Sequence, residues 1–284
     1  MDSENYEVLS DGGVKLYCTC SYPDRPAQAV LIIVHGLGEH SGRYNELAAE
    51  FLKNEIAVFT FDHRGHGQSG GKKGHAKSIE QLVEDTEQAF MKCRSIFLDI
   101  PIFLFGHSMG GQVVASYLSL IKSREVSGAI ISSAWFSLVK RPPSWLINFT
   151  GILKGYLPSV TVPNGLEADV ISTVAEEVEA YKNDPLVHKW ISLSLFHSLY
   201  HHGLDLLKFS TATEVPVLVC HGGNDTTTSL DGSRTYAEKL GKKATFRIWK
   251  GARHEPHHDF DKANVIQFYV NWIKNQVKEI SNAT

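Results

Sequence analysis

The sequence has no long hydrophobic run and little net charge. Its longest uninterrupted apolar stretch, residues 29–34, is much too short to span a bilayer. Residues 1–5 are polar and acidic, which predicts no secretory signal peptide. The formal net charge of −3 gives no electrostatic footprint for nucleic acid. These absences predict a cytoplasmic protein without a nucleic-acid partner.

Cysteine is also scarce. The four cysteines, at positions 18, 20, 93 and 220, show neither zinc-ligand nor disulfide spacing. We expect reduced, buried thiols, which fits a cytosolic protein. The chain of 284 residues is more naturally one large α/β domain with an insertion than two independent domains.

A nucleophile motif, Gly-His-Ser-Met-Gly, lies at residues 106–110. An apolar run at 101–105 predicts a strand before it, and an apolar stretch at 111–121 predicts a helix after it. A strand, a Gly-x-Ser-x-Gly turn and a helix are the sequence signature of a nucleophile elbow. The turn is so sharp that larger side chains at the glycine positions would collide. We therefore interpret Ser108 as a catalytic nucleophile.

A serine nucleophile needs a base that accepts its proton and an acid that orients the base. Asp225 follows a predicted strand at 215–219, and His254 follows another at 245–249. Loops at the carboxyl edge of a parallel sheet can converge, and ligands bind at that edge. We expect Ser108, Asp225 and His254 to form a catalytic triad.

Other residues compete for two of these roles. Asp205 and Asp231 are alternative acids, but no strand precedes Asp205, and Asp231 lies deeper in its loop or on the next helix. His257 and His258 are alternative bases that stand farther from the end of the strand. The order of acid and histidine after successive strands favours the triad named above.

A glycine-rich loop offers an oxyanion hole. The run at 29–34 predicts a strand buried on both faces, and His35-Gly36-Leu37-Gly38 follows it. Such a loop lets backbone approach a substrate carbonyl closely. We expect the backbone N–H groups of Leu37 and Met109 to donate to the oxyanion. Losing one such donor typically costs about 3 kcal/mol of transition-state stabilisation.

Strand and helix patterns alternate along most of the chain, which predicts a mostly parallel, doubly wound sheet. The stretch between residues 135 and 209 breaks this alternation and is too long for a loop. We predict a core at 1–135 and 210–284 with a helical cap inserted at 136–209. Predicted strands lie near 6–9, 14–20, 29–34, 56–61, 101–105, 126–132, 215–219 and 244–249, and predicted helices near 43–54, 78–95, 109–122, 144–156, 172–181, 185–208, 230–240 and 260–277.

The first cap helix, at 144–156, carries apolar residues at helical spacing. Packing onto the core is one interpretation of such a stripe. The other is a lid that lines an acyl channel and contacts a membrane surface. We expect a mixture, in which substrate binds against Leu146, Phe149, Ile152 and Leu153.

Histidines gather in two places, at 197, 201 and 202 and at 254, 257 and 258. A metal site of this type usually has a carboxylate or cysteine ligand and an organised second shell. His254 is better used as a general base, because an unperturbed imidazole pKa of about 6.5 suits that role. We expect no metal and no other cofactor.

Several motifs resemble those of monoglyceride lipases and their bacterial lysophospholipase-like relatives. The motifs lie at residues 35–44, 61–69, 106–111, 183–187 and 253–255, and the similarity runs from about Asp11 to Ile273. The resemblance implies an α/β-hydrolase fold with a helical cap, hydrolysis of a carboxylic ester in a lipid-like substrate, and the triad and oxyanion donors named above. Three threonines at 226–228 replace the more apolar stretch of many relatives, which changes the expected pocket wall.

The most direct prediction is a monoacylglycerol lipase that releases glycerol and a fatty acid through an acyl-serine intermediate. Lysophospholipase, small-ester carboxylesterase, peptidase and thioesterase are alternatives, because pocket shape decides among them. Dehalogenases and epoxide hydrolases carry aspartate at the elbow, so Ser108 argues against both. An intact triad argues against a non-catalytic ligand-binding homologue. The predicted partners are a lipid ester and, through the cap, a membrane surface.

Overall fold

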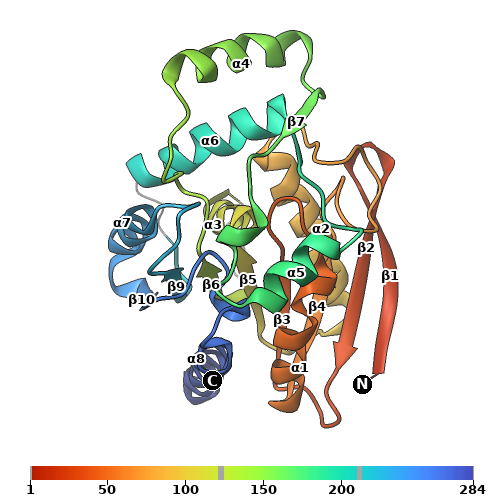
Figure 1. The fold of residues 1–284 in the computed structure, drawn as a ribbon. Helices are drawn as coiled ribbons and strands as arrows, with labels where there is room; N and C mark the ends of the chain where they lie inside the picture. The colour runs from red at the N-terminus through yellow and green to blue at the C-terminus, as the bar shows by residue number, and fades with distance from the viewer. Residues whose placement is uncertain (1, 121–124, 210–212, 284) are drawn as a thin grey trace.

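The computed structural model describes residues 2–120, 125–209 and 213–283 (Figure 1). Its centre is an eight-stranded sheet in the order β1-β2-β4-β3-β5-β6-β9-β10. β1 pairs antiparallel with β2, and β2 with β4, whereas the remaining pairs are parallel. The predicted α/β-hydrolase fold with a mostly parallel sheet is confirmed. The strands are β1 (Asp2–Ser10), β2 (Val14–Tyr22), β3 (Ala29–Val34), β4 (Ile56–Phe61), β5 (Ile102–His107), β6 (Val126–Ser132), β9 (Val217–Gly222) and β10 (Ala244–Trp249).

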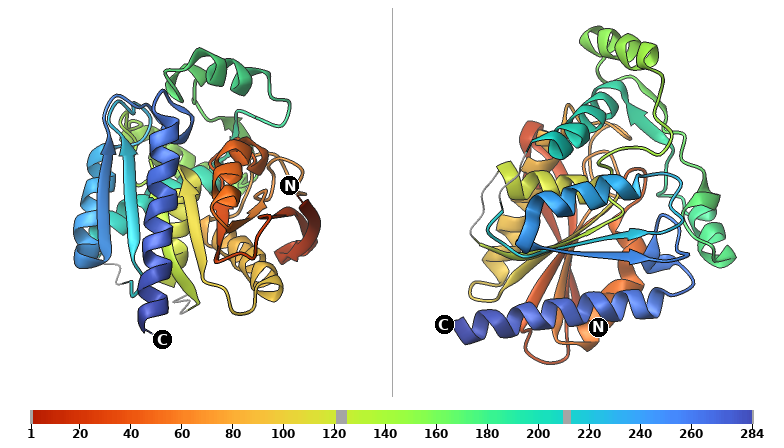
Figure 2. Two further views of the ribbon diagram at one scale, coloured as in Figure 1. Left: turned by 90° about the horizontal axis from the view of Figure 1, so that it is seen from below. Right: turned by 90° about the vertical axis from the view of Figure 1, so that its left-hand side faces the viewer.

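Helices cover both faces of this sheet. One hydrophobic core contains residues of α2, α3 and α7, and the second, on the other face, contains residues of α1 and α8. Figure 2 shows α8 running along its face of the sheet. The helices are α1 (Asn45–Lys53), α2 (Ile79–Ile96), α3 (Met109–Leu120), α7 (Leu230–Leu240) and α8 (Lys262–Ala283).

β3 shows why an unbroken apolar run forms a central strand. Successive side chains of a strand point to opposite faces of the sheet. Val30, Ile32 and Val34 accordingly belong to the first core, and Ala29, Leu31 and Ile33 to the second. All six residues are buried, so neither face tolerates a polar side chain.

Residues 136–209 contribute no strand to the large sheet and carry the helices α4, α5 and α6. β7 and β8 pair only with each other. α4 lies outermost, beyond α6 (Figure 1). We propose 136–209 as the extent of the cap. Its elements are α4 (Ser144–Tyr156), β7 (Thr161–Pro163), α5 (Ala175–Asn183), β8 (Trp190–Ser192) and α6 (Leu193–Lys208).

The predicted helices near 185–208 and 260–277 are among those that begin too early. α6 begins at Leu193 rather than near 185, because β8 occupies 190–192 and the Ser192 hydroxyl accepts from the Leu195 N–H as an N-cap. α8 begins at Lys262 rather than near 260, and the side chain of Phe260 is 60% exposed. Residues 121 and 122 of a third predicted helix lie outside the described residues.

Two expectations about composition can be compared with the structure. Cys18, Cys20, Cys93 and Cys220 are all free thiols and buried. Within the described ranges, no helix combines the length and the apolar character that crossing a bilayer requires.

The central strand β5 depends on the packing of Phe105. This side chain is fully buried, and its ring centroid lies 5.9 Å from that of Tyr44 and 5.8 Å from that of Tyr269. Phe105→Ala should lower the free energy of unfolding by about 3–5 kcal/mol, because it removes buried apolar surface and leaves a cavity. Urea denaturation measures this change. Leu98→Ala, at a side chain that is 71% exposed, is the control and should stay within about 0.5 kcal/mol of the parent chain. Equal effects of the two substitutions would contradict this account.

Candidate active site

Ser108 lies in a strained turn between β5 and α3. Its φ angle is +51°, a left-handed conformation that non-glycine residues rarely adopt. The positions of Gly106 and Gly110 have no room for a side chain. A Cβ at Gly106 would lie 2.4 Å from the Gly110 carbonyl oxygen, and one at Gly110 would lie 2.0 Å from the carbonyl oxygen of Val34. This geometry places the Ser108 side chain at the tip of a central strand and at the start of a helix.

The structure brings together the three residues of the expected triad. The Ser108 hydroxyl donates to His254 Nε2 at 3.0 Å, and His254 Nδ1 donates to Asp225 Oδ2 at 2.8 Å. The side chains of His254 and Asp225 are almost completely buried. Three separate loops at the carboxyl edge of the sheet thus form one hydrogen-bonded chain.

Backbone N–H groups hold one carboxylate oxygen of Asp225. Its Oδ1 accepts from the N–H groups of Thr227 at 2.7 Å and Thr228 at 3.1 Å. The alternative acids stand elsewhere. The Asp231 side chain is 92% exposed on α7, and Asp205 lies on the exposed side of α6. Neither forms a described hydrogen bond with a histidine of this site.

The charges of these residues favour proton transfer from Ser108 to His254. Burial alone would raise the pKa of Asp225, but His254 and a hydrogen bond from His221 hold that pKa well below its ordinary value. Burial alone would lower the pKa of His254, but the Asp225 charge and hydrogen bond outweigh burial and raise it. Burial lowers the pKa of the neighbouring His107 to about 4, so that ring stays neutral near His254.

The loop after β3 lies beside the serine. Leu37 and Ser108 line the same cavity, and Met109 is the first residue of α3. Glu39 fixes the loop, because its Oε1 accepts from the Gly36 N–H at 2.6 Å. The two backbone groups that we expected to donate to an oxyanion therefore belong to segments that flank Ser108.

A buried ion-pair network connects this loop with the loop of His254. The guanidinium of Arg43 donates to Glu255 through two hydrogen bonds of 2.7 and 2.8 Å and to Glu39 at 2.9 Å. Burial would raise the pKa of Glu255, but Arg43 holds it well below its usual range. These three residues lie in the motifs at 35–44 and 253–255, but sequence analysis assigned them no role. The available signal was the charge carried by the loop after β3 and by the loop after β10.

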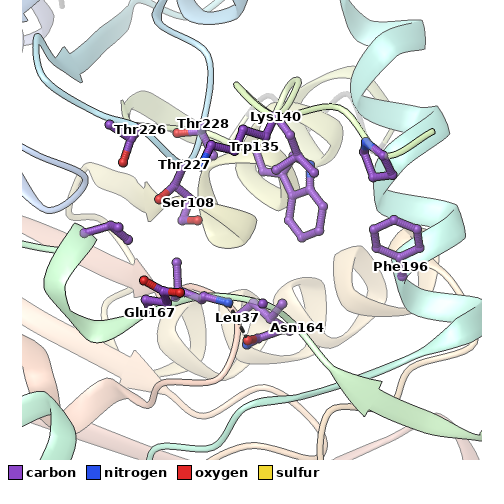
Figure 3. Close-up of a pocket in the computed structure, with 15 residues that line it drawn as sticks. Leu37, Ser108, Trp135, Lys140, Asn164, Glu167, Phe196, Thr226, Thr227 and Thr228 are labelled. Atoms are coloured by element: carbon purple, nitrogen blue, oxygen red, sulfur yellow. Dashed lines mark hydrogen bonds between the residues drawn. The ribbon is translucent and has the colours of Figure 1, made fainter.

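A cavity of about 360 Å³ opens onto Ser108 (Figure 3). The rings of Trp135 and Phe196 stand in its wall, with centroids 6.3 Å apart. Polar groups occur mainly on the cap segment 164–167 and on the loop 226–228. The residues that line it are Leu37, Ser108, Trp135, Leu138, Lys140, Pro142, Asn164, Gly165, Leu166, Glu167, Val170, Phe196, Thr226, Thr227 and Thr228.

The residues expected from sequence to bind substrate lie elsewhere. Leu146, Phe149, Ile152 and Leu153 do not line this cavity. Phe149 is 53% exposed and Ile152 is 66% exposed. The reason is the position of α4, which packs on α6 rather than over Ser108. Helical spacing identifies an apolar face but not the direction in which that face points, so a substrate role for these four residues stays a prediction.

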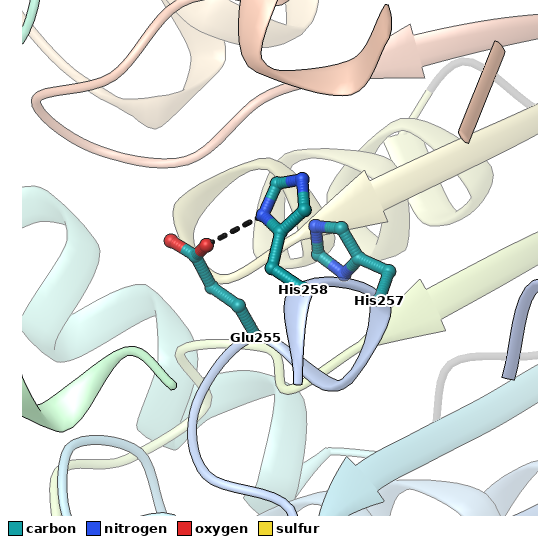
Figure 4. Close-up of side chains that lie close together, drawn as sticks. All are labelled: Glu255, His257 and His258. Atoms are coloured by element: carbon teal, nitrogen blue, oxygen red, sulfur yellow. Dashed lines mark hydrogen bonds and ion pairs between the residues drawn. The ribbon is translucent and has the colours of Figure 1, made fainter. Parts of the chain in front are cut away.

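Several histidines of the two clusters have hydrogen-bond partners within the protein. His258 Nδ1 lies 2.7 Å from Glu255 Oε2, and its Nε2 lies 3.0 Å from the carbonyl oxygen of Arg43 (Figure 4). Three residues, Glu255, His257 and His258, place ligand atoms close enough together to hold a metal ion. Two of them, Glu255 and His258, already form a hydrogen bond with each other. In the cap, His197 lies 2.9 Å from Lys154 Nζ, and His202 lies 2.8 Å from the Ser116 hydroxyl.

Comparison with known proteins gives a consistent assignment. Residues 25–261 match the family described as serine aminopeptidase, S33. A monoacylglycerol lipase of Mycolicibacterium smegmatis is 30% identical over 92% of this chain and 94% of its own length. A phospholipase, YtpA of Bacillus subtilis, is 27% identical over 86% of this chain and 94% of its own length. An uncharacterized abhydrolase domain-containing protein of Dictyostelium discoideum is 30% identical, but this chain spans only 27% of it.

Solved structures agree with this assignment. The monoacylglycerol lipase of Paleococcus ferrophilus superposes with a TM-score of 0.84 and 32% identity, over 92% of this chain and 99% of that one. A soluble variant of the monoglyceride lipase of Saccharomyces cerevisiae superposes with a TM-score of 0.86 at 23% identity, over 97% and 95%. The chain therefore belongs to the S33 family of α/β-hydrolases, as a serine hydrolase of the group that contains the monoglyceride lipases and related phospholipases.

Proposed function

We propose that this protein hydrolyses carboxylic esters of lipids, and monoacylglycerol to glycerol and a fatty acid in particular. The observation that carries the proposal is the hydrogen-bonded chain from Ser108 through His254 to Asp225, which meets a largely apolar cavity at its serine end. The similarity to monoacylglycerol lipases along nearly the whole chain supports the substrate class.

Acylation begins when Ser108 attacks the ester carbonyl and His254 accepts the hydroxyl proton. Asp225 keeps the imidazole in the tautomer that can accept this proton, and its charge stabilises the imidazolium. Backbone N–H groups of Leu37 and Met109 donate to the oxyanion. His254 then protonates the leaving alcohol, and an acyl ester on Ser108 remains. Water, deprotonated by His254, attacks that ester and releases the fatty acid.

The cavity wall has two chemical parts. Trp135, Leu138 and Phe196 offer apolar surface for an acyl chain. Lys140 and Glu167 offer charged groups that can bind the hydroxyls of an alcohol. A single-chain ester with a small polar alcohol matches both parts. Lysophospholipid is the second candidate, favoured by the positive charge of Lys140 in the wall and by the similarity to a phospholipase.

Substrate preference can be measured by fatty-acid release from a long-chain monoacylglycerol, the matching lysophosphatidylcholine and a short acyl ester. We expect the monoacylglycerol to be preferred, and Ser108→Ala to lower its turnover by several orders of magnitude, because triad members act as a unit. Preference for the lysophospholipid would favour the second candidate. Turnover of the short ester alone would contradict the lipid assignment, and near-normal turnover by Ser108→Ala would mean another nucleophile.

The pH dependence of the reaction should follow the protonation of His254. The base must be neutral to accept a proton, and its raised pKa means that kcat/KM should fall with decreasing pH already above the ordinary imidazole value of about 6.5. Asp225→Asn removes the charge that raises this pKa. The acid limb should therefore move to lower pH, and the rate on the plateau should fall by roughly 10⁴-fold. An acid limb that is unchanged in Asp225→Asn would show that another group controls it.

We also propose that α4 contacts a membrane surface. Trp145, Phe149, Ile152 and Tyr156 recur at helical spacing, and each is more than half exposed. Water-exposed aromatic and aliphatic side chains on one helix face are typical of a helix that lies in a lipid interface. Such a position would bring a sparingly soluble ester to the cap.

A double substitution tests the membrane contact. Trp145→Ser with Ile152→Ser should lower binding to phosphatidylcholine vesicles by about tenfold or more, because burial of each such side chain is worth about 1.5–3 kcal/mol. Cosedimentation measures binding, and hydrolysis of a soluble short ester should be unchanged. The matched control is Met91→Ser with Leu98→Ser, two exposed residues outside the cap. Equal vesicle binding by the two folded double variants would rule out the contact.

A further inference from the structure

A second histidine contacts the acid of the proposed triad. His221 lies on β9, four residues before Asp225, and is completely buried. Its Nε2 lies 3.1 Å from Asp225 Oδ2, the same oxygen that accepts from His254. Its Nδ1 lies 2.8 Å from the hydroxyl of Ser233, a buried residue of α7. Two imidazole rings, those of His254 and His221, therefore contact the Asp225 carboxylate.

The surroundings of His221 determine where its proton lies. Nε2 faces two acceptors, Asp225 Oδ2 at 3.1 Å and the Thr228 carbonyl oxygen at 3.1 Å. A bare nitrogen there would repel both oxygens, so Nε2 carries the hydrogen. Nδ1 is then left to accept from the Ser233 hydroxyl. The ring therefore connects α7 to Asp225, and the single Nε2 hydrogen is shared between Asp225 Oδ2 and the Thr228 carbonyl oxygen.

We propose that His221, held in this tautomer by Ser233, is a positioning residue that orients Asp225 and limits its electrostatic effect on His254. This inference rests on the proposed esterase function and adds His221 and Ser233 to the residues that support it. The resulting chain is nearly symmetric, since a serine and a histidine stand on each side of one carboxylate. Of these four residues, only Ser108 lines the cavity.

The other hydrogen bonds to Asp225 do not make His221 redundant. The backbone N–H groups of the loop bind Oδ1, not the oxygen that accepts from His254. The Thr228 hydroxyl lies 2.8 Å from Oδ2 but also 3.0 Å from the Ser133 carbonyl oxygen, so its one hydrogen, like that of His221 Nε2, is shared between two acceptors. His221 is therefore the second nitrogen donor at the oxygen whose position sets the direction of the His254 ring.

Removal of this donor has a predictable electrostatic direction. A hydrogen bond from His221 draws negative charge away from the face of Oδ2 that His254 contacts. Without it, Asp225 acts more strongly on His254 and further raises the pKa of that base. The other titratable groups around His254 are His107, Glu39 and Glu255, and they are unchanged by a substitution at His221.

The test compares His221→Phe, His221→Gln and Ser233→Ala with the parent chain, by kcat and the pH profile of kcat/KM on a soluble short ester. In His221→Phe we expect kcat to fall by about 10–100-fold, as for other hydrogen-bond partners that orient a reacting group. Its acid limb should move to higher pH, opposite to Asp225→Asn. Glutamine keeps an N–H donor near the position of Nε2, so His221→Gln should restore most of kcat and the parental acid limb. Ser233→Ala should shift both properties in the direction of His221→Phe.

Each outcome is decisive. A folded His221→Phe with parental kcat and acid limb overturns the positioning role. A loss of kcat without a shift of the acid limb, equal in the Phe and Gln variants, also overturns it, because that pattern indicates packing alone. If His221→Phe does not fold, a shifted acid limb in Ser233→Ala together with rescue in His221→Gln supports the role. Turnover by Ser108→Ala would instead contradict the proposed function, so the two failures are distinct.

Discussion

The geometry of the site depends on the buried guanidinium of Arg43. It binds Glu39 in the loop after β3 and Glu255 in the loop after β10, which lie on opposite sides of Ser108 in the sheet order. Removing one partner of a buried ion pair typically costs about 3–5 kcal/mol, because a charge remains without compensation. The loop that contains Leu37 and the loop that contains His254 are therefore fixed relative to each other.

The cap also contacts Arg43 and Glu255. The ring of Tyr181 on α5 lies 4.6 Å from the Arg43 guanidinium, and the Glu255 N–H donates to the carbonyl oxygen of Ile171 at 2.8 Å. His40 and Asp184, a further pair between core and cap, are 2.8 Å apart. A cap held in this way forms part of the cavity wall without contributing a side chain to the Ser108 hydrogen-bonded chain.

Sequence patterns predicted those parts of the molecule whose causes are local. The buried run of β3 and the glycines around Ser108 follow from period and steric demand within a few residues. The Arg43 network could not be predicted in the same way, because Glu255 stands 212 residues farther along the chain. The orientation of α4 could not be predicted from the sequence either. Its apolar spacing indicated a face, while the cavity wall is formed by Trp135 and Phe196 from segments that no periodic pattern connects.

The cavity separates substrate choice from the proposed chemistry. Thr227 holds Asp225 through its backbone N–H, while its side chain is part of the cavity wall. A different side chain at this position would change the wall but keep the hydrogen bond, since every residue except proline carries the N–H. The threonines at 226–228 can therefore alter which ester fits without disturbing the acid. The similarity of the catalytic loops consequently says more about the type of bond that is cleaved than about the lipid that carries it.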